Sequence, residues 1–191
     1  MSDFRTFRGR ALTYISMRRT DTHKPSTIEI IEVSDEASIN KTERLAKEIW
    51  RQHYLPIIGK DQVEYMLEKF QSKQAIYEQI QNGFIYYLIK INDDYLGYLS
   101  VLPKEDTGEL FLSKIYIRLE QRGKGYGNMT MDFVESLARR RNLNRITLTV
   151  NKHNADSIKA YQKMGFRIVD SIVQDIGDGF IMDDYGMEKL L

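Results

Sequence analysis

Gln121-Arg122-Gly123-Lys124-Gly125-Tyr126-Gly127 is the stretch that decides the fold. It follows an apolar strand pattern, Leu112 to Ile117, and precedes a helical pattern that starts at about Asn128. Glycines admit positive φ angles, and the backbone N–H groups of such a turn and of the following helix start point toward one spot. The sequence therefore predicts an anion-binding turn between a strand and a helix.

The spacing of the glycines narrows the choice of anion. The pattern G-x-G-x-G lacks the last interval of the dinucleotide fingerprint, and no Gly-Lys-Ser/Thr follows a four-residue gap as in nucleoside-triphosphate loops. What the turn does contain is the pattern Arg122-x-x-Gly125-x-Gly127, directly after the apolar strand. After a second predicted strand, Arg145 to Val150, comes a second motif, N-x-x-S-x-x-x-Y-x-x-x-G-F, which runs from Asn154 to Phe166.

Together, in this order and at this separation, the two motifs resemble the acyl-CoA-dependent N-acetyltransferase superfamily (GNAT). The resemblance extends from about Leu110 to Phe166 and is thinner outside these residues. It implies one α/β domain, with a mixed, mostly antiparallel sheet of about seven strands flanked by helices. It also implies an acyltransferase with acetyl-CoA as its co-substrate and an amine as the acceptor.

The resemblance implies roles for individual residues. The turn would hold the CoA pyrophosphate, and the strand before it would hydrogen-bond the pantetheine through backbone groups. The implied cofactor-binding residues are Ile115, Ile117, Arg122, Gly123, Lys124, Gly125, Tyr126, Gly127, Asn128, Asn154 and Ser157. Tyr161 corresponds to the phenol that protonates the departing thiolate. Two alternatives stay open, because Asn154 is also a natural helix cap and Tyr161 could be a core tyrosine.

The acceptor side is less defined. In the resembled family the helices after the first strand form it, so His53 and Tyr54 are candidates for the substrate pocket, although aromatics at helical spacing are more often core. Three residues come into question as the general base. His53 requires the helices to fold over the thioester, Glu109 lies far along its strand, and Tyr116 points to the face opposite Ile115 and Ile117. Polyamines, amino acids and peptides are all open as acceptors.

The remaining elements follow from periodicity and turn residues. The sequence predicts a first strand over Thr27–Val33 and a helix capped near Asp35 that Pro56 and Gly59 break. Helices over Asp61–Gln71 and after Ser72 follow, then a hairpin of Phe84–Ile91 with Tyr95–Leu102 and a strand over Glu109–Ile117. After Phe166 we expect a strand to about Asp170 and a last strand over Phe180–Lys189.

Composition excludes several classes of protein. The 191 residues are 42% hydrophobic, which suits a single domain with one core. The formal charge of +1 argues against a protein dominated by nucleic acid or an anionic membrane, and the absence of cysteine excludes disulfides and thiolate sites. The three histidines do not have metal-ligand spacing, and no apolar run reaches membrane-spanning length. We therefore expect a cytoplasmic protein without a metal, with a homodimer as one expected state.

Residues 1–26 differ from residues 27–191, which we expect to form the catalytic domain. They carry six basic and two acidic side chains. We expect an unpacked basic leader or a short helix that docks on the body, and a nucleic-acid-binding arm is the remaining alternative. For the whole chain, the sequence predicts acetyl transfer from acetyl-CoA to a primary amine by direct attack. The alternative is a non-catalytic module that binds acyl-CoA.

Overall fold

The computed structural model of the protein describes residues 13–20 and 23–191, with side chains from residue 28 onward. The described residues form one eight-stranded sheet in the order β1-β2-β3-β4-β5-β6-β8-β7. The elements are β1 (Thr13–Thr20), β2 (His23–Glu32), α1 (Glu36–Ile58), α2 (Lys60–Gln71), α3 (Lys73–Gln81), β3 (Ile85–Ile91), β4 (Asp94–Lys104), η1 (Glu105–Thr107), β5 (Glu109–Ile117), η2 (Leu119–Gln121), α4 (Tyr126–Arg140), β6 (Arg145–Asn151), α5 (Ala155–Lys163), β7 (Arg167–Gly177) and β8 (Phe180–Leu190).

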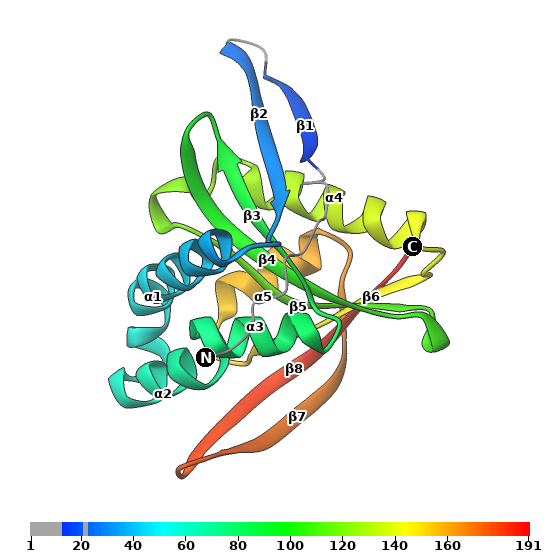
Figure 1. The fold of residues 1–191 in the computed structure, drawn as a ribbon. Coiled ribbons are helices and arrows are strands. Elements are labelled where there is room, and N and C mark those ends of the chain that lie inside the picture. Colours follow the sequence, from blue (N-terminus) through cyan, green and yellow to red (C-terminus); the bar gives the residue numbers. More distant parts are fainter. Residues whose placement is uncertain (1–12, 21–22) are drawn as a thin grey trace.

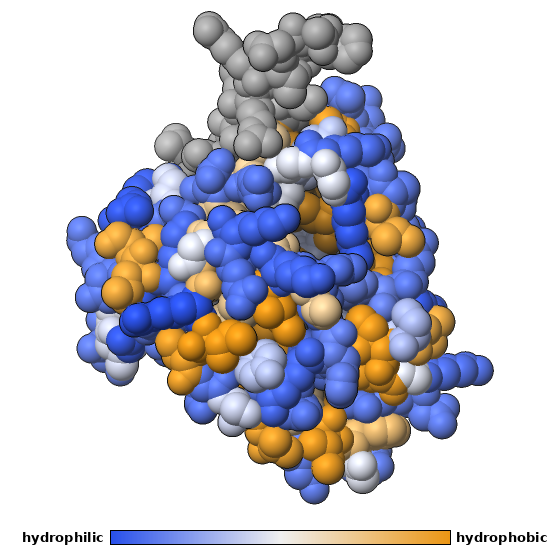
Figure 2. Space-filling model, turned by 180° about the vertical axis from the view of Figure 1, so that it is seen from behind, coloured by the Kyte–Doolittle hydropathy of each residue, from blue (hydrophilic) through white to orange (hydrophobic). Residues whose placement is uncertain are grey.

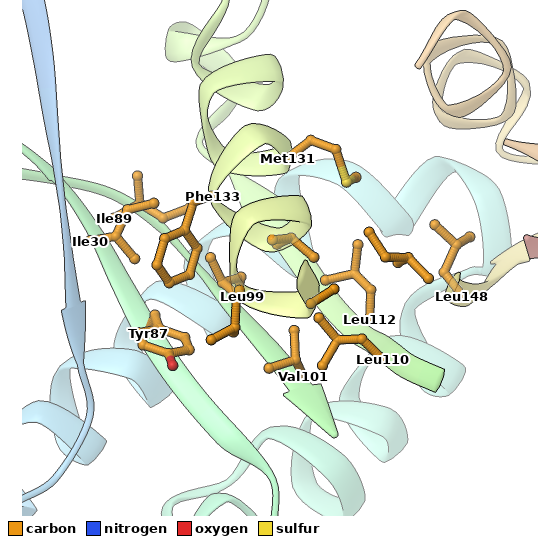
Figure 3. Close-up of a cluster of buried hydrophobic side chains, with 14 of the residues drawn as sticks. Ile30, Tyr87, Ile89, Leu99, Val101, Leu110, Leu112, Met131, Phe133 and Leu148 are labelled. Atoms are coloured by element: carbon orange, nitrogen blue, oxygen red, sulfur yellow. The ribbon is translucent and has the colours of Figure 1, made fainter. Parts of the chain in front are cut away.

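Helices cover the sheet on both faces (Figure 1). One core cluster joins α4 to the strands, with Met131 and Phe133 packed over residues such as Leu99 and Leu112 (Figure 3). A second cluster joins α1, α2 and α3 to the other face through residues such as Trp50 and Tyr98. All strand pairs are antiparallel except β5 with β6. The predicted mixed, mostly antiparallel sheet flanked by helices is confirmed.

The parallel pair opens the sheet. β5 and β6 are paired only from Glu109 with Arg145 to Phe111 with Thr147. Beyond that point β5 runs on to Ile117 and β6 to Asn151, with no further pairing between them. Ser113 is also an extra residue opposite β4, a β-bulge that shifts the alternation of side chains along β5. The opened sheet is where the site lies.

Several predicted boundaries were wrong. Pro56 lies inside the last turn of α1 instead of breaking it, and the helix ends only at Gly59, whose φ is 80°. β2 begins at His23, before Thr27, and α4 begins at Tyr126 because Gly125 already takes the cap position. β7 runs beyond Asp170 to Gly177. It is largely exposed and shows no apolar periodicity, and its pairing with β8 keeps it extended.

The segment before residue 27 contains β1, which pairs antiparallel with β2. Residues 13–20 are therefore a strand and not the short helix of the alternative prediction, whereas residues 1–12 lie outside the described part of the chain. At the opposite end of the molecule, hydrophobic residues gather on the surface near β7 and β8 (Figures 1 and 2), where Val173 and Ile181 are exposed. Among the helices of the described residues, none has the length and apolar character needed to cross a membrane.

Candidate active site

The glycine turn has the geometry of an anion site. Gly123 has a φ of 75° and Gly125 a φ of 88°, left-handed values that side chains with a Cβ rarely adopt. They let the chain turn directly into α4, whose first N–H groups have no partner within the helix. Positive charge from the helix dipole and from Arg122 and Lys124 adds to these donors. The turn therefore fits a pyrophosphate.

A cleft of about 1410 Å³ runs from this turn along the gap between β5 and β6. The N–H of Arg118 donates to the carbonyl of Leu96 at 2.8 Å, so this residue turns its backbone N–H toward β4. Because backbone groups alternate along a strand, those of Ile115 and Ile117 face the gap. One of them already has a partner there, since Nε of Arg122 donates to the carbonyl of Ile117 at 3.0 Å. This edge offers hydrogen-bonding groups to an extended ligand.

His53 brings α1 to the glycine turn. Its Nδ1 lies 2.9 Å from Nη1 of Arg122, and its Nε2 lies 3.0 Å from Nδ2 of Asn154. Burial, and then the charge of Arg122, lower the pKa of His53, so the ring is neutral at pH 7. A neutral imidazole accepts at only one nitrogen, whereas both neighbouring atoms donate. The ring therefore cannot satisfy Arg122 and Asn154 at the same time.

Asn154 caps a helix and also lines the cleft. Its side-chain oxygen accepts from the N–H of Ser157 and so caps α5. The residue is almost fully buried, lines the cleft and contacts His53 from α1. Capping therefore fixes the position of a side chain that also faces the ligand space.

Three tyrosines from three elements meet behind this contact. The ring centroids of Tyr54 on α1 and Tyr116 on β5 lie 6.3 Å apart, and Tyr161 on α5 lies close enough for its pKa to respond to Tyr54. Burial raises the pKa of all three phenols above 10. Their hydroxyls are therefore protonated at pH 7 and can donate hydrogen bonds. Tyr161 remains partly exposed toward the cleft.

The structure adds two cleft residues that the sequence reasoning missed. Asp184 on β8 is buried, and burial raises its pKa although hydrogen bonds with Thr149 and Asn151 lower it in part. Its charge reaches Tyr54, whose pKa it helps to raise. Lys114 on β5 is 7% exposed, and its Nζ donates to Oε1 of Gln79 at 2.6 Å. A cation within the apolar run of β5 was a signal for Lys114, whereas no pattern pointed to Asp184.

The predicted site residues mostly come together. The cleft is lined by Tyr161, His53, Tyr54 and all the predicted cofactor-binding residues except Tyr126, namely Ile115, Ile117, Arg122, Gly123, Lys124, Gly125, Gly127, Asn128, Asn154 and Ser157. The side chain of Tyr126 packs in the core instead, because the start of α4 turns it toward the sheet.

Two of the three candidates for the general base do not suit that role. Glu109 is occupied by Lys104, Arg145 and Thr147, and although burial raises its pKa, the hydrogen bonds from Lys104 and Thr147 lower it overall. Tyr116 faces the helices α1–α3, opposite Ile115 and Ile117, and its raised pKa keeps it protonated.

Solved structures share this fold. An N-acetyltransferase, PaiA, from Thermoplasma acidophilum in complex with coenzyme A has a TM-score of 0.72 and 19% identity over 86% of this chain and 99% of its own. A GCN5-related N-acetyltransferase from Rhodopseudomonas palustris has a TM-score of 0.70 and 16% identity over 85% of this chain and 94% of its own. A spermidine N-acetyltransferase chimera of Vibrio cholerae SpeG and hSSAT has a TM-score of 0.65 and 16% identity over 85% and 95%.

The model of the acetyltransferase (GNAT) family matches residues 43–166, about two-thirds of the chain. The match includes α1 from residue 43 onward, with His53, as well as both sequence motifs. It confirms the resemblance, the enzyme class of acyltransferase and acetyl-CoA as the co-substrate. On this match the chain belongs to the acetyltransferase (GNAT) family.

Proposed function

We propose that this protein transfers the acetyl group of acetyl-CoA to a primary amine, with direct attack of the amine on the thioester. The acceptor would be a small molecule, such as a polyamine or an amino acid, or a peptide. One observation carries the proposal: the anion-binding turn, the open edge of β5 and Tyr161 all line the same cleft. A regulatory module that binds acyl-CoA without turnover needs the first two features but not the phenol.

Cofactor binding follows from the chemistry of the cleft. The N–H groups of the turn, together with Arg122 and Lys124, would hold the pyrophosphate. The guanidinium of Arg122 has five N–H donors, so it would donate to the pyrophosphate while Nη1 stays beside Nδ1 of His53, which positions it. The backbone groups of Ile115 and Ile117 would hold the pantetheine, which displaces the present contact from Arg122 to Ile117.

The residues at the inner end of the cleft suit the transfer step. The amine nitrogen attacks the thioester carbonyl, and the N–H of Ile115 would stabilise the oxyanion. The carbon–sulfur bond then breaks, and the protonated hydroxyl of Tyr161 would give its proton to the sulfur. Asp184 would take the proton that the amine releases, since burial raises its pKa and so makes it a better base than an exposed carboxylate. Solvent returns the proton from Asp184 to Tyr161.

The test is release of free CoA thiol from acetyl-CoA across a panel of primary amines. The chain has no cysteine, so the protein adds no thiol background. We expect turnover with one class of amine and a strong loss in the Tyr161→Phe variant. Calorimetry with acetyl-CoA runs beside it. Binding without turnover for every amine would favour the regulatory module, and the absence of binding would contradict the proposal.

A further inference from the structure

The side chain of Lys114 extends from β5 to Gln79 on α3. Its Nζ donates to Oε1 of Gln79 at 2.6 Å and to Oγ of Ser113 at 3.2 Å. The rings of Phe84 and Tyr86 lie 5.7 and 5.3 Å from the same nitrogen. An ammonium group carries three N–H donors, so one remains beyond the two hydrogen bonds. Lys114 lines the cleft, as does Gln79.

This buried cation lacks a counter-ion. None of the ion pairs within the described part of the chain includes Lys114. Burial lowers the pKa of Lys114 to about 7, with no offset from a neighbouring acid. A buried charge without an opposite charge is strongly unfavourable, which is why such groups are normally paired.

The charged and titratable groups around Lys114 do not fill this role. Glu78 on α3 lines the same cleft, but it is directed to Gln74, whose Nε2 donates to it at 2.7 Å. Lys69 on α2 is a cation itself and donates to Tyr65 and Ile176. Burial raises the pKa of Tyr86 on β3, so its hydroxyl is neutral. No group on these elements supplies the missing negative charge.

Gln79 is fixed in place and cannot turn away. Its Oε1 also accepts from the hydroxyl of Tyr86 at 2.8 Å, and its Nε2 donates to the carbonyl of Phe70 at 3.0 Å. This network holds Nζ of Lys114 at one position. The side chain also lies on the same face of β5 as Tyr116, toward α1–α3, whereas Ile115 lies on the other face. Lys114 is therefore on the side of the sheet that the acceptor would occupy.

We propose that Lys114 binds a carboxylate of the acceptor, so that the acceptor is an amine that also carries a carboxylate, such as an amino acid or a peptide. This inference rests on the proposed acetyl transfer. It narrows the class of acceptor to amines with a carboxylate and so excludes polyamines as the preferred acceptors. The bound carboxylate supplies the negative charge that the protein lacks at this point. A single ammonium matches one carboxylate, whereas a phosphate is commonly held by several donors or by the fork of an arginine.

The test uses pairs of acceptors that differ in the carboxylate alone: lysine with cadaverine, ornithine with putrescine, and phenylalanine with phenethylamine. At pH 7 we expect kcat/KM to be at least about tenfold higher for the carboxylated member, as for one charge-assisted hydrogen bond. Lys114→Met should remove this preference by lowering kcat/KM for the carboxylated members only. Lys69→Met is the control, because Lys69 lines the cleft but has partners within the protein.

Two further comparisons separate the outcomes. The preference should fall as the pH rises above about 7, where Lys114 loses its proton. β-Alanine is also compared with O-phosphoethanolamine. If the phosphate compound is preferred and Lys114→Met removes that preference, the group that Lys114 binds is a phosphate and not a carboxylate. Binding of the same pairs to the complex with CoA is measured by calorimetry. If no acceptor is acetylated, the proposed function fails, whereas an absence of any carboxylate preference in binding and turnover overturns this inference alone.

Discussion

Nη1 of Arg122 in the glycine turn lies 2.9 Å from Nδ1 of His53 on α1. The contact joins the helical side of the site to the cofactor side, and we propose that His53 positions Arg122 through it. We expect His53→Leu to raise KM for acetyl-CoA about tenfold with little change in kcat, because a hydrogen bond to a charged group is lost. His53→Gln should have a smaller effect, since its amide oxygen can accept from Arg122. Steady-state kinetics with varied acetyl-CoA measure both parameters. A hundredfold fall in kcat at unchanged KM would instead make His53 the general base.

Tyr161→Phe removes the proposed proton donor and keeps the ring. We expect kcat to fall by about 10²- to 10⁴-fold, the usual contribution of general acid catalysis, while the dissociation constant of acetyl-CoA stays within a few-fold. Rates come from thiol release and affinities from calorimetry. Tyr87→Phe is the matched control. It also deletes a phenol hydroxyl, but Tyr87 packs in the core next to Phe133, outside the cleft. A Tyr161→Phe variant as active as the wild type would show that Tyr161 does not donate the proton.

Asp184→Asn removes the proposed proton acceptor with little change in shape. In the wild type, kcat/KM should rise with pH as Asp184 loses its proton, with a midpoint above the ordinary carboxyl value of 3.8. The variant should lose about 10²-fold or more in kcat together with this limb of the pH profile. Asp183→Asn is the control, since Asp183 is more exposed and pairs with Lys152. Equal losses in the two variants would argue against a catalytic role for Asp184.

Lys114→Met should stabilise the protein. The folded state lowers the pKa of Lys114 from 10.5 to about 7, so between these values the unfolded chain binds more protons than the folded one. The stability of the wild type therefore increases with pH across this window, and the penalty from Lys114 is fully present below pH 7. We expect the variant to gain about 1–3 kcal/mol in the free energy of unfolding at pH 7 and progressively less toward pH 10. Urea denaturation at several pH values measures this.

A gain in stability with loss of carboxylate preference would be the trade-off expected of a residue kept for function. A loss of stability at pH 7 would show instead that the contact between Lys114 and Gln79 outweighs the burial of the charge.

The sequence predicted those parts of the site whose residues lie close together along the chain. The glycine turn and the motif from Asn154 to Phe166 have fixed spacings, because each lies within one turn–helix unit. The roles of the α1 residues were not predictable in this way, since His53 meets Arg122 and Asn154 only after α1 packs on the sheet. Asp184 is brought to the cleft by the pairing of β8 with β6, which no local pattern encodes. The part of β7 beyond Asp170 was not predicted, because an exposed edge strand needs no alternation of apolar side chains.

A crystal structure of the complex with CoA tests the central claim most directly. The account predicts the pyrophosphate within hydrogen-bonding distance of the N–H groups of residues 123–128. It also predicts the pantetheine along Ile115 and Ile117, in the gap between β5 and β6, and the sulfur next to the hydroxyl of Tyr161. CoA bound outside this gap, or bound with its pyrophosphate away from the turn, would contradict it.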